Sequence, residues 1–501
     1  MTGAVRLTGA TPCLGNYWKS IDWKKVRREV KRLQMRIAKA VRENRWNKVR
    51  CLERTLTHSF FAKLLAVKRV SSRKGSRTPG VDNVIWNTPA KKMRGALSLN
   101  TRNYKASPLK RKLIPKKNGK MRTLGIPTMK DRAMQALFLL YLEPIAETTA
   151  DNNSYGFRRF RGCRDAVSQC FCALGKSYSA QWILDADIKA CFDEINHSWL
   201  LENIPMNKKI LRQWLESGFV YDRQLFPTRT GTPQGGIASP TLANMTLDGL
   251  ESTVRNCFQK RIKGIRTKIN FIRYADDFIV TAASKEILQD KVIPAINDFL
   301  KLRGLKLSPE KTRIAHIDEG FNFLGQNLRK YNNKLIIQPA KDNVKSFLEK
   351  VKGIMVKYRG CKTEILIRKL NPVIRGWGNY HRLIQSSKAF GRLQEFIHDA
   401  LIKWAKRQNG DKTLKWIYYH FWGISSDKKH FACVTTDKKG RTKKLELLKL
   451  TDIRLARYIK IKGAANTFDP EYQKFFWMRR KSKNMTIIQT NSLRTAGLTS
   501  T

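Results

Sequence analysis

Two short acidic clusters are the parts of this sequence best suited to chemistry. Adjacent Asp276 and Asp277 interrupt the strand-like run FIRYADDFIV, and Asp185 and Asp187 lie two residues apart in LDADIKACFD. Because side chains alternate along a strand, Asp185 and Asp187 share one face. Like charges this close in a β context are costly unless a cation compensates them. A tight hairpin with Asp276 and Asp277 at its tip would present both to such a cation.

The cation that fits these ligands is Mg²⁺, since the clusters offer hard oxygen atoms with no His or Cys beside the Asp-Asp pair. Carboxylates on two strands suggest a two-metal site, in which one ion activates the attacking oxygen and the other steadies the leaving group. A bare Asp-Asp pair is more often a solvated surface turn. Two such clusters in a chain with 39 acidic against 99 basic residues favour the metal site. The predicted chemistry is phosphoryl transfer on nucleic acid.

The composition supports a polyanionic partner. The 501 residues carry a formal net charge of +60, while 42% hydrophobic and 10% aromatic residues exclude wholesale disorder. Nucleic acid would neutralise that charge best, and an anionic membrane surface comes second. The longest apolar run, 133–142, is too short to cross a bilayer. We therefore expect a nucleic-acid partner and no membrane.

The cysteines indicate the compartment. Nine are scattered along the chain, and the one close pair, Cys170 and Cys172, lacks CxxC spacing. This favours reduced thiols and no structural zinc. The segment from Met1 to Trp18 does not form a secretory signal, although its lack of acids leaves a transit peptide open. We expect the cytoplasm of a bacterium, with the interior of a mitochondrion or plastid as the alternative.

The elements that must position the aspartates follow from the hydrophobic pattern. Basic amphipathic periodicity predicts two helices over 22–70, followed by a loop at 71–80. Alternation on both sides of Asn118-Gly119 predicts a basic β-hairpin over 112–126. A helix is expected at 131–147, then alternating helices and strands to about residue 325, and mainly helix after 341. The fold class is α+β.

The same motifs resemble a known family. YADD (274–277), DIKACFD (187–193) and GTPQGGIASP (231–240) are similar, in order and spacing, to core motifs of reverse transcriptases. The wider set looks like the proteins encoded by group II introns. It includes IPKKNGKMRTLGIP (114–127), SYGFR (154–158), GLKLSPEKT (304–312), LNPVIRGWGNYHR (370–382) in the maturase domain, and AVKRVSSRKGSRTPGVD (66–82) in the N-terminal extension.

The resemblance implies a right-hand polymerase in four parts. These are a helical N-terminal extension (1–82), fingers and palm (83–340), an α-helical thumb or maturase domain X (341–410), and a small basic DNA-binding region (411–501). Many relatives continue into an HNH endonuclease with paired CxxC motifs. Such motifs do not occur in these 501 residues, so we expect the form without that domain, primed by a strand end made elsewhere.

The resemblance also assigns roles at the polymerase site. Asp187, Asp276 and Asp277 match the catalytic triad, and it is this match, not spacing, that selects Asp187 over Asp185. The carbonyl of Ile188 would assist in holding two Mg²⁺ ions. For the nucleotide, the matching residues are Phe192, a steric gate against the 2′-hydroxyl, Gln234 beside the sugar, and Lys116 and Arg122 at the triphosphate. Phe192 could instead be a core residue, and the two cations could instead bind template phosphates.

The family binds its intron RNA through the N-terminal extension and thumb. The candidates here are basic residues of those regions: Lys68, Arg69, Arg73, Lys74, Arg375, Arg382, Lys403 and Arg407. For Trp377 and Tyr380 we favour burial in the thumb core over base stacking. The C-terminal segment resembles a region that binds target DNA.

The expected function is RNA-directed DNA synthesis from dNTPs by target-primed reverse transcription, together with splicing of a group II intron. Two rivals stay open. One is a splicing-only maturase whose polymerase domain has decayed, which the intact Asp187, Asp276 and Asp277 argue against. The other is a domesticated reverse transcriptase that no longer serves an intron.

Overall fold

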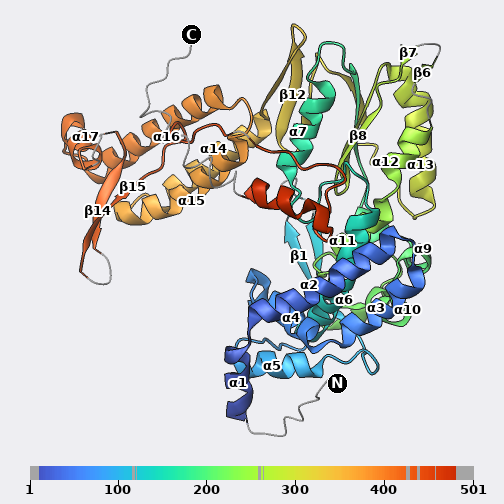
Figure 1. Ribbon diagram of the computed structural model, residues 1–501. Helices are drawn as coiled ribbons and strands as arrows, with labels where there is room; N and C mark the ends of the chain where they lie inside the picture. Colours follow the sequence, from blue (N-terminus) through green and yellow to red (C-terminus); the bar gives the residue numbers. More distant parts are fainter. Residues whose placement is uncertain are drawn as a thin grey trace. The chain divides into compact units, whose positions relative to one another are not determined.

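The computed structural model describes residues 11–115, 119, 121–257, 261–262, 265–424, 429–436, 440–456 and 458–480 (Figure 1). They divide into two units. Unit 1 holds the described residues within 1–169, 182–314 and 461–478, and unit 2 those within 170–181, 315–460 and 479–480. No helix among the described residues is long and apolar enough to cross a membrane.

Unit 1 begins with α-helices that carry basic outer faces. They are α1 (Thr11–Ser20), α2 (Trp23–Arg42), α3 (Trp46–His58) and α4 (Phe60–Ser71), followed by η1 (Lys74–Arg77) and α5 (Pro89–Ser98). Asp22 caps α2 by accepting the backbone N–H groups of Lys24 and Lys25 at 2.8 and 3.1 Å. The sequence predicted two helices over 22–70, and this is wrong, because the structure has three there: α2, α3 and α4. Ser59, with φ −63° and ψ 125°, breaks the second helix because its backbone is extended.

Helix α6 (Met129–Thr149) forms the centre of unit 1, and α4 and α2 pack on it. Phe138 and Tyr141, on this helix, are almost fully buried. Thr128 caps its N-terminus by accepting the backbone N–H of Asp131 at 3.2 Å. The helix predicted at 131–147 is confirmed.

Two four-stranded sheets lie in unit 1. The first has the order β2-β1-β4-β5, with β1 (Leu109–Pro115), β2 (Met121–Ile126), β4 (Phe219–Tyr221) and β5 (Gln224–Phe226). Strands β1 and β2 are antiparallel with Pro115 opposite Met121, which confirms the strands of the basic hairpin. Its turn residues other than Gly119 lie outside the described residues.

The second sheet has the order β10-β3-β9-β8, with β3 (Trp182–Asp187), β8 (Asn270–Tyr274), β9 (Asp277–Ala282) and β10 (Arg313–His316). Phe271, Phe278 and Val280 on these strands are fully buried. The helices that follow and flank the strands in sequence are α7 (Cys163–Leu174), α8 (Cys191–Glu194), α9 (His197–Asn203), α10 (Lys208–Leu215), α11 (Ser239–Leu247), α12 (Leu250–Asn256), η2 (Ile287–Val292) and α13 (Ile293–Lys301). A short ribbon joins β6 (Arg261–Ile262) to β7 (Ile265–Arg266), and the short η3 (Pro470–Tyr472) comes much later in the chain.

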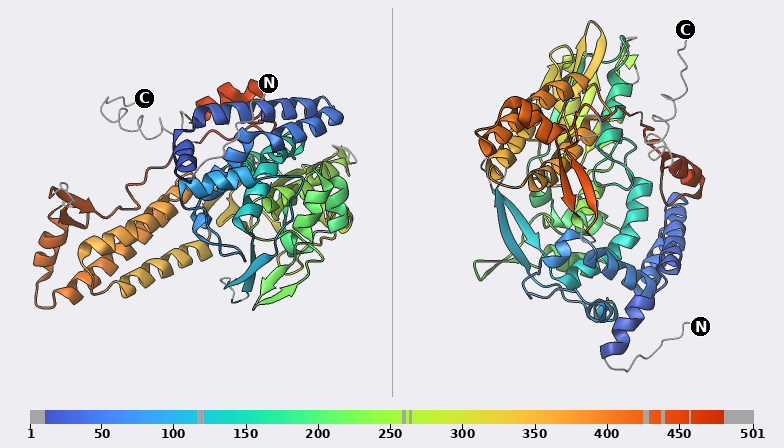
Figure 2. Two further views of the ribbon diagram at one scale, coloured as in Figure 1. Left: turned by 90° about the horizontal axis from the view of Figure 1, so that it is seen from below. Right: turned by 90° about the vertical axis from the view of Figure 1, so that its left-hand side faces the viewer.

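Residues 461–478 belong to unit 1 although the whole of 315–460 separates them from its other parts in sequence. Their course runs beside α2 in all three ribbon views (Figures 1 and 2). The buried Arg161 guanidinium donates to the carbonyls of Gly463 and Ala465 at 2.6 and 3.2 Å. Asp469 pairs with Arg42 at the end of α2. No hydrophobic periodicity in this segment predicts such docking.

Unit 2 contains a three-stranded antiparallel sheet and a helical bundle. The sheet has β11 (Phe321–Phe323), β12 (Gln326–Tyr331) and β13 (Lys334–Pro339), and the bundle has α14 (Lys341–Lys357), α15 (Thr363–His381), α16 (Ser387–Gln408) and α17 (Leu414–Trp422). A hairpin of β14 (Ala432–Thr436) and β15 (Thr442–Glu446) follows. The mainly helical pattern predicted after 341 is confirmed up to α17.

Trp377 and Tyr380 serve the packing of unit 2, as we favoured. The Trp377 ring lies 4.8 Å from Phe347 between ring centroids, and its indole N–H donates to Asn343 Oδ1 at 2.9 Å. The Tyr380 hydroxyl donates to the carbonyl of Leu324 at 2.7 Å. Both rings are therefore held by internal partners.

Candidate active site

The Asp-Asp pair lies at a tight hairpin, as predicted. Strands β8 and β9 are joined by Ala275 and Asp276, with Tyr274 opposite Asp277. Ala275 has φ +61°, a left-handed conformation that a two-residue turn requires at its first position. On the other side of β9, Asp187 on β3 is the register partner of Asp277. The hairpin tip and the end of β3 thus bring Asp187, Asp276 and Asp277 together.

The electrostatics of this cluster disfavour its charged state. Burial raises the pKa of Asp277 to about 7, with further contributions from Asp185, Asp187 and Asp276. Burial, and then the charge of Asp187, also raise the pKa of Asp276, which Lys311 and Arg122 partly oppose. A group of carboxylates that repel one another while partly buried is a site where an added cation would be stabilised.

Asp185 and Asp187 each have a basic partner. Arg313 Nε lies 3.2 Å from Asp185 Oδ2, and Lys311 Nζ lies 2.9 Å from Asp187 Oδ2. Asp185 also stands two register positions from the hairpin tip, opposite Ile279. The side chain of Lys311 is 62% exposed, so its ammonium group reaches Asp187 from the solvent side. Sequence reasoning missed Lys311, although it lies in the quoted motif GLKLSPEKT.

The donor set suits a hard divalent metal. It consists of carboxylate oxygens, and the backbone carbonyl of Asp276 accepts the N–H of Ile188 at 3.1 Å, which ties the two arms together. In the parts of the chain that the structure describes, no three His, Cys, Asp or Glu side chains are already gathered in a metal-binding arrangement. The carboxylate oxygens are of the kind that Mg²⁺ prefers, and Asp187 is paired with Lys311 in the structure.

The candidate nucleotide-binding residues lie around the same tip. Phe192 is half-buried and Arg122 is exposed on β2, close enough to lower the pKa of Asp276. The side-chain amide of Gln234 donates to Asp193 Oδ2 at 3.4 Å. The backbone carbonyl of Gln234 accepts the N–H of Gly125 at 2.8 Å. That last bond fastens the basic hairpin to the GTPQGG turn. Lys116 lies outside the described residues.

The loop that carries SYGFR (154–158) packs against the turn of the YADD hairpin. This motif was quoted from the sequence without a role. A Cβ atom on Gly156 would lie 3.0 Å from Ala275 Cα and closer still to its backbone nitrogen. Asn244 Nδ2 donates to the Gly156 carbonyl at 2.8 Å, and the buried Arg273 donates to Asn244 Oδ1 at 3.2 Å. The sequence signal was the Gly in SYGFR, which only this close approach explains.

Comparison with known proteins decides the family. Three family models match: "N-terminal domain of reverse transcriptase" over residues 18–99, "Reverse transcriptase (RNA-dependent DNA polymerase)" over 114–328, and "Group II intron, maturase-specific domain" over 344–422. Protein YkfC of Escherichia coli is 31% identical over 307 residues, covering 52% of this chain and 79% of that protein. The chain belongs to the group II intron-encoded reverse transcriptases and maturases.

A second relative and one solved structure complete the comparison. The group II intron-encoded protein LtrA of Lactococcus lactis is 30% identical over 331 residues, which are 53% of this chain and 54% of LtrA, so the chain spans about half of that relative's length. The telomerase of Candida albicans, solved with a fragment of telomeric RNA, matches 65% of this chain and 64% of its own at a TM-score of 0.37 and 14% identity. With the three family models in this order, the predicted family, α+β polymerase fold, enzyme class and reverse transcriptase and maturase functions are confirmed.

The candidate RNA-binding residues in unit 1 of this intron-encoded protein differ in whether their side chains already contact other residues of the protein. Lys68 Nζ lies 3.6 Å from the centre of the Trp23 ring, and Arg69 pairs with Glu143 at 2.8 Å, so both have structural partners. Arg73 is exposed. For Lys74 the side chain lies outside what the structure describes.

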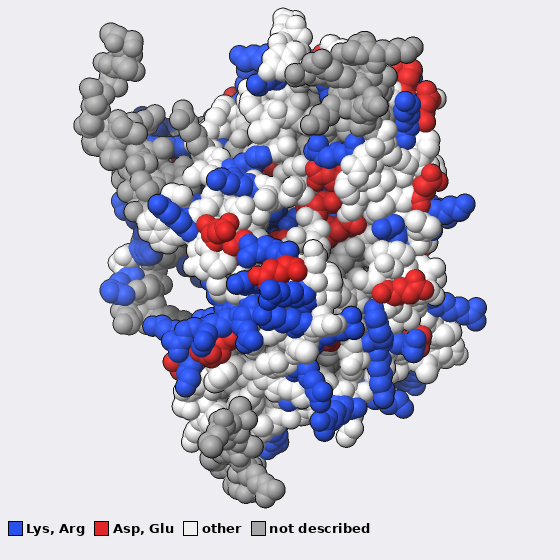
Figure 3. Space-filling model, turned by 45° about the vertical axis from the view of Figure 1, so that its right-hand side comes forward, with Lys and Arg blue, Asp and Glu red and all other residues white. Residues whose placement is uncertain are grey.

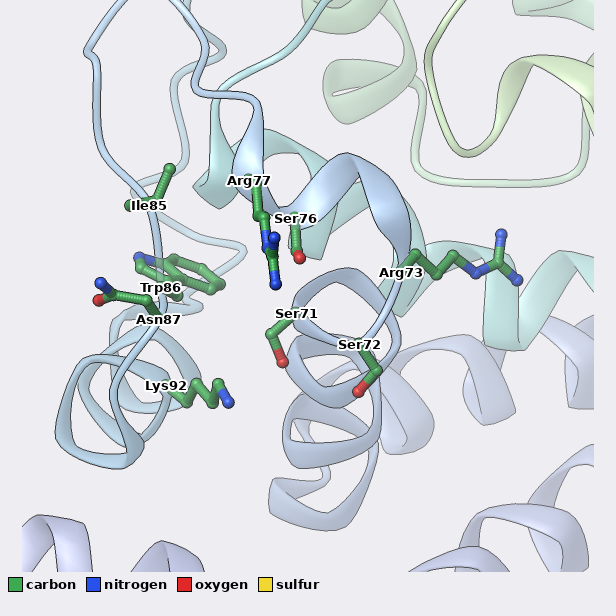
Figure 4. Close-up of a pocket in the computed structure, with 9 residues that line it drawn as sticks. All are labelled: Ser71, Ser72, Arg73, Ser76, Arg77, Ile85, Trp86, Asn87 and Lys92. Carbon is green, nitrogen blue, oxygen red and sulfur yellow. The ribbon is translucent and has the colours of Figure 1, made fainter. Parts of the chain in front are cut away.

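A hollow of about 770 Å³ lies beside Arg73 in unit 1. Its lining combines hydroxyls, amide and cations with one aromatic ring: Ser71, Ser72, Arg73, Ser76, Arg77, Ile85, Trp86, Asn87 and Lys92. In Figure 4 the side chains of Arg77 and Lys92 lie near Trp86 and the serine side chains, whereas the side chain of Arg73 points away from the other labelled residues. Arg77 and Lys92 are thus further candidates for phosphate contacts, which sequence reasoning missed.

A second hollow of about 450 Å³, in unit 2, contains two of the candidates. Lys403 and Arg407 line it together with Lys352 and Arg359 around an apolar floor that includes Trp404. Arg375 is exposed, whereas Arg382 is half-buried and donates to Asn379 Oδ1 at 3.4 Å. On the face drawn in Figure 3, Lys and Arg form one connected band, and other basic residues are scattered among smaller acidic groups. Such surfaces suit nucleic-acid phosphates.

Proposed function

We propose that the cluster of Asp187, Asp276 and Asp277 is the polymerase site for RNA-directed DNA synthesis with two Mg²⁺ ions. The observation that supports this best is the register of the sheet, which sets Asp187 opposite Asp277 beside the hairpin tip. Ile188, whose carbonyl is the further proposed ligand, adjoins the turn, since its backbone N–H donates to the Asp276 backbone carbonyl at 3.1 Å. Reverse transcriptases are Mg²⁺-dependent as a family, and this chain carries their domain.

The chain's own residues would prepare the reaction. Asp187 and Asp276 hold the metal, with Asp277 as the less direct third acid. When bound, Mg²⁺ supplies a Lewis acid for the attacking oxygen and neutralises the leaving pyrophosphate. Arg122, together with Lys116, attracts the triphosphate of a dNTP, and Gln234 lies beside the sugar. Phe192 excludes a 2′-hydroxyl by steric conflict.

Metal binding itself tests the assignment of the carboxylates. We expect Asp187→Asn and Asp276→Asn each to weaken Mn²⁺ binding at least about 10-fold, measured by electron paramagnetic resonance, since each removes a charged ligand. Asp185→Asn is the matched control, because Asp185 lies on the same strand but opposite Ile279, two register positions from the hairpin tip. Equal weakening by all three substitutions would contradict the assignment.

We further propose that the exposed cations of both units bind the group II intron RNA as a ribonucleoprotein. The support is the position of Lys403 and Arg407 on one side of a hollow in the domain that matches the maturase model. Structured RNA is recognised mainly through phosphates and 2′-hydroxyls, which such cations suit. Within the C-terminal region, we propose that the basic strand β15, which contains Lys443 and Lys444, binds target DNA and primer.

The RNA proposal is tested with intron RNA and matched charge substitutions. Replacing Lys403 and Arg407 by Gln should lower RNA affinity about 10-fold, measured by filter binding at fixed salt. The control is the double replacement of Lys388 and Arg392 by Gln, which removes two exposed charges of the same helix outside the hollow. If both substitutions weaken binding equally, the hollow has no special part in RNA binding.

The four-part division at 82/83, 340/341 and 410/411 remains a proposal, as does a bacterial cytoplasm with an organelle interior as the alternative. Among the described residues eight cysteines form no disulfide bond, as expected in a reducing compartment.

A further inference from the structure

The loop that carries SYGFR is held rigidly at almost every residue. The Asp151 carboxylate accepts the backbone N–H groups of Gly249 and Glu251 at 3.1 and 3.2 Å. Arg158 pairs with Glu147 at 3.0 Å, and their side chains are only 5% and 6% exposed. Tyr155 donates its backbone N–H to the Arg273 carbonyl at 2.9 Å, directly beside the catalytic turn. The loop is therefore fixed to the same strand that carries the YADD hairpin.

Phe157 stands out within this loop. The residue is 57% exposed, and its backbone has φ +57°, which a bulky L-residue rarely adopts. Strained backbone of this kind persists where the surroundings enforce it and where function needs the side chain in that place. An exposed large ring on a strained, anchored backbone stabilises the fold little.

The ring of Phe157 packs against the proposed steric gate. Its centroid lies 6.2 Å from that of Phe192, and the ring planes meet at 79° in an edge-to-face contact. Edge-to-face aromatic pairs at this distance attract one another beyond simple burial. Because Phe192 is only half-buried, the contact with Phe157 limits how far its ring can turn.

We infer that Phe157 is a positioning residue that holds Phe192 in place and so sets the discrimination between dNTPs and rNTPs. This inference rests on the proposed role of Phe192. A gate ring that can swing aside admits a 2′-hydroxyl, whereas one supported at its edge excludes it. Phe157 does not need to touch the nucleotide to have this effect.

Phe160 provides a matched control in the same loop. It is also a phenylalanine with positive φ, +58°, and it is 47% exposed. Its ring packs on Phe476, at 5.4 Å between centroids, and not on Phe192. Removing either ring disturbs the loop similarly, but only Phe157 supports the gate.

The test compares the ratio of kcat/KM for a dNTP to that for the matching rNTP on one primed RNA template. Phe157→Ala should lower this ratio about 5- to 10-fold, mainly by improving use of the rNTP. Phe160→Ala should leave the ratio within about twofold. In the background of Phe192→Val, Phe157→Ala should add almost nothing, because the supported ring is gone.

The outcomes separate this inference from the proposed function. If Phe192→Val relaxes discrimination and Phe157→Ala does not, Phe192 is the gate and the positioning role is wrong. If Phe192→Val leaves the ratio unchanged, the gate assignment fails, and this inference fails with it.

A thermal unfolding measurement guards against a merely structural role. Phe157→Gly should unfold at or above the wild-type temperature, since glycine adopts the positive φ of this position without strain, and yet it should lower the ratio as Phe157→Ala does. A drop in unfolding temperature with an unchanged ratio would show that Phe157 serves packing alone and would overturn the inference.

Discussion

Gly156 controls where the YADD turn can lie, because a side chain there would collide with the backbone of Ala275. We expect Gly156→Ala to displace the YADD turn and to lower kcat for nucleotide addition about 100-fold, in line with the cost of small misplacements of reacting groups. The measurement is steady-state primer extension, with circular dichroism to show that the fold is kept.

Gly162→Ala is the matched control for that substitution. It lies in the same region of the chain, and a Cβ atom there would meet nothing within 4 Å. Wild-type kcat for Gly156→Ala, or equal losses for both variants, would show that the close approach to Ala275 does not matter for catalysis.

The residues of the site were predictable only where they are adjacent in sequence or match a motif. Asp276 and Asp277 follow from a strand interrupted by two acids. Lys311 and Gly156 lie in motifs that assigned them no role, because their partners are distant along the chain: Lys311 pairs with Asp187, and Gly156 packs on Ala275. Such pairings depend on how the sheet is assembled, which local patterns do not encode.

At the scale of elements, the end of α15 contains a buried titratable group. His381 is fully buried, lies against the rings of Trp377 and Tyr380, and neither ring nitrogen has a hydrogen-bond partner among the described residues. Burial lowers the pKa of His381 to about 4.

The free energy of unfolding of unit 2, which contains α15, should therefore fall in mild acid. A histidine whose pKa is lower in the folded than in the unfolded state stabilises the fold above about pH 6.5 and loses that contribution as pH falls towards 4. We expect about 2 kcal/mol of this loss by pH 5. Urea unfolding of wild type and His381→Gln at pH 7 and pH 5 measures it.

The His381→Gln variant lacks this titration, so its free energy of unfolding should fall less between the two pH values. Equal falls in both proteins would mean that His381 does not protonate on unfolding, and that other groups cause any acid sensitivity.

Residues 461–478 form the other element whose role can be measured. Arg161 donates to three backbone carbonyls, those of Asn152, Gly463 and Ala465. Arg161→Met should lower the free energy of unfolding of unit 1 by about 2 to 4 kcal/mol, because it leaves buried carbonyls without donors. Chemical denaturation followed by tryptophan fluorescence checks this.

Arg229→Met, which replaces an exposed Arg of the same unit, is the control. If Arg161→Met costs no more than this exposed substitution does, the C-terminal segment is not held through Arg161.

Elements were predictable to the extent that their pattern is local. The 131–147 helix and the basic hairpin follow from periodicity, and α6 and β1–β2 confirm them. The break at Ser59 depends on one backbone conformation without Gly or Pro, so no composition signal marks it. The docking of 461–478 depends on Arg161 and Arg42, far away in sequence, and could not be read from the segment itself.

For the whole molecule, the charge of +60 implies binding that is sensitive to salt. If six phosphates are contacted, log K for RNA should fall with a slope of about −4 against log salt, which is a loss of roughly 300-fold between 50 and 200 mM. Filter binding across a salt series measures the slope. A slope shallower than about −1 would mean that most of the charge does not meet RNA.

The central claim is that this chain copies RNA into DNA at the Asp187, Asp276 and Asp277 site. The most direct test is addition of a single dNTP to a DNA primer annealed to an RNA template, with Mg²⁺, by wild type and by Asp276→Ala. We expect incorporation by wild type that stops when Mg²⁺ is chelated, and a loss of at least about 1,000-fold in the variant. No incorporation by wild type, or equal incorporation by Asp276→Ala, would contradict the claim.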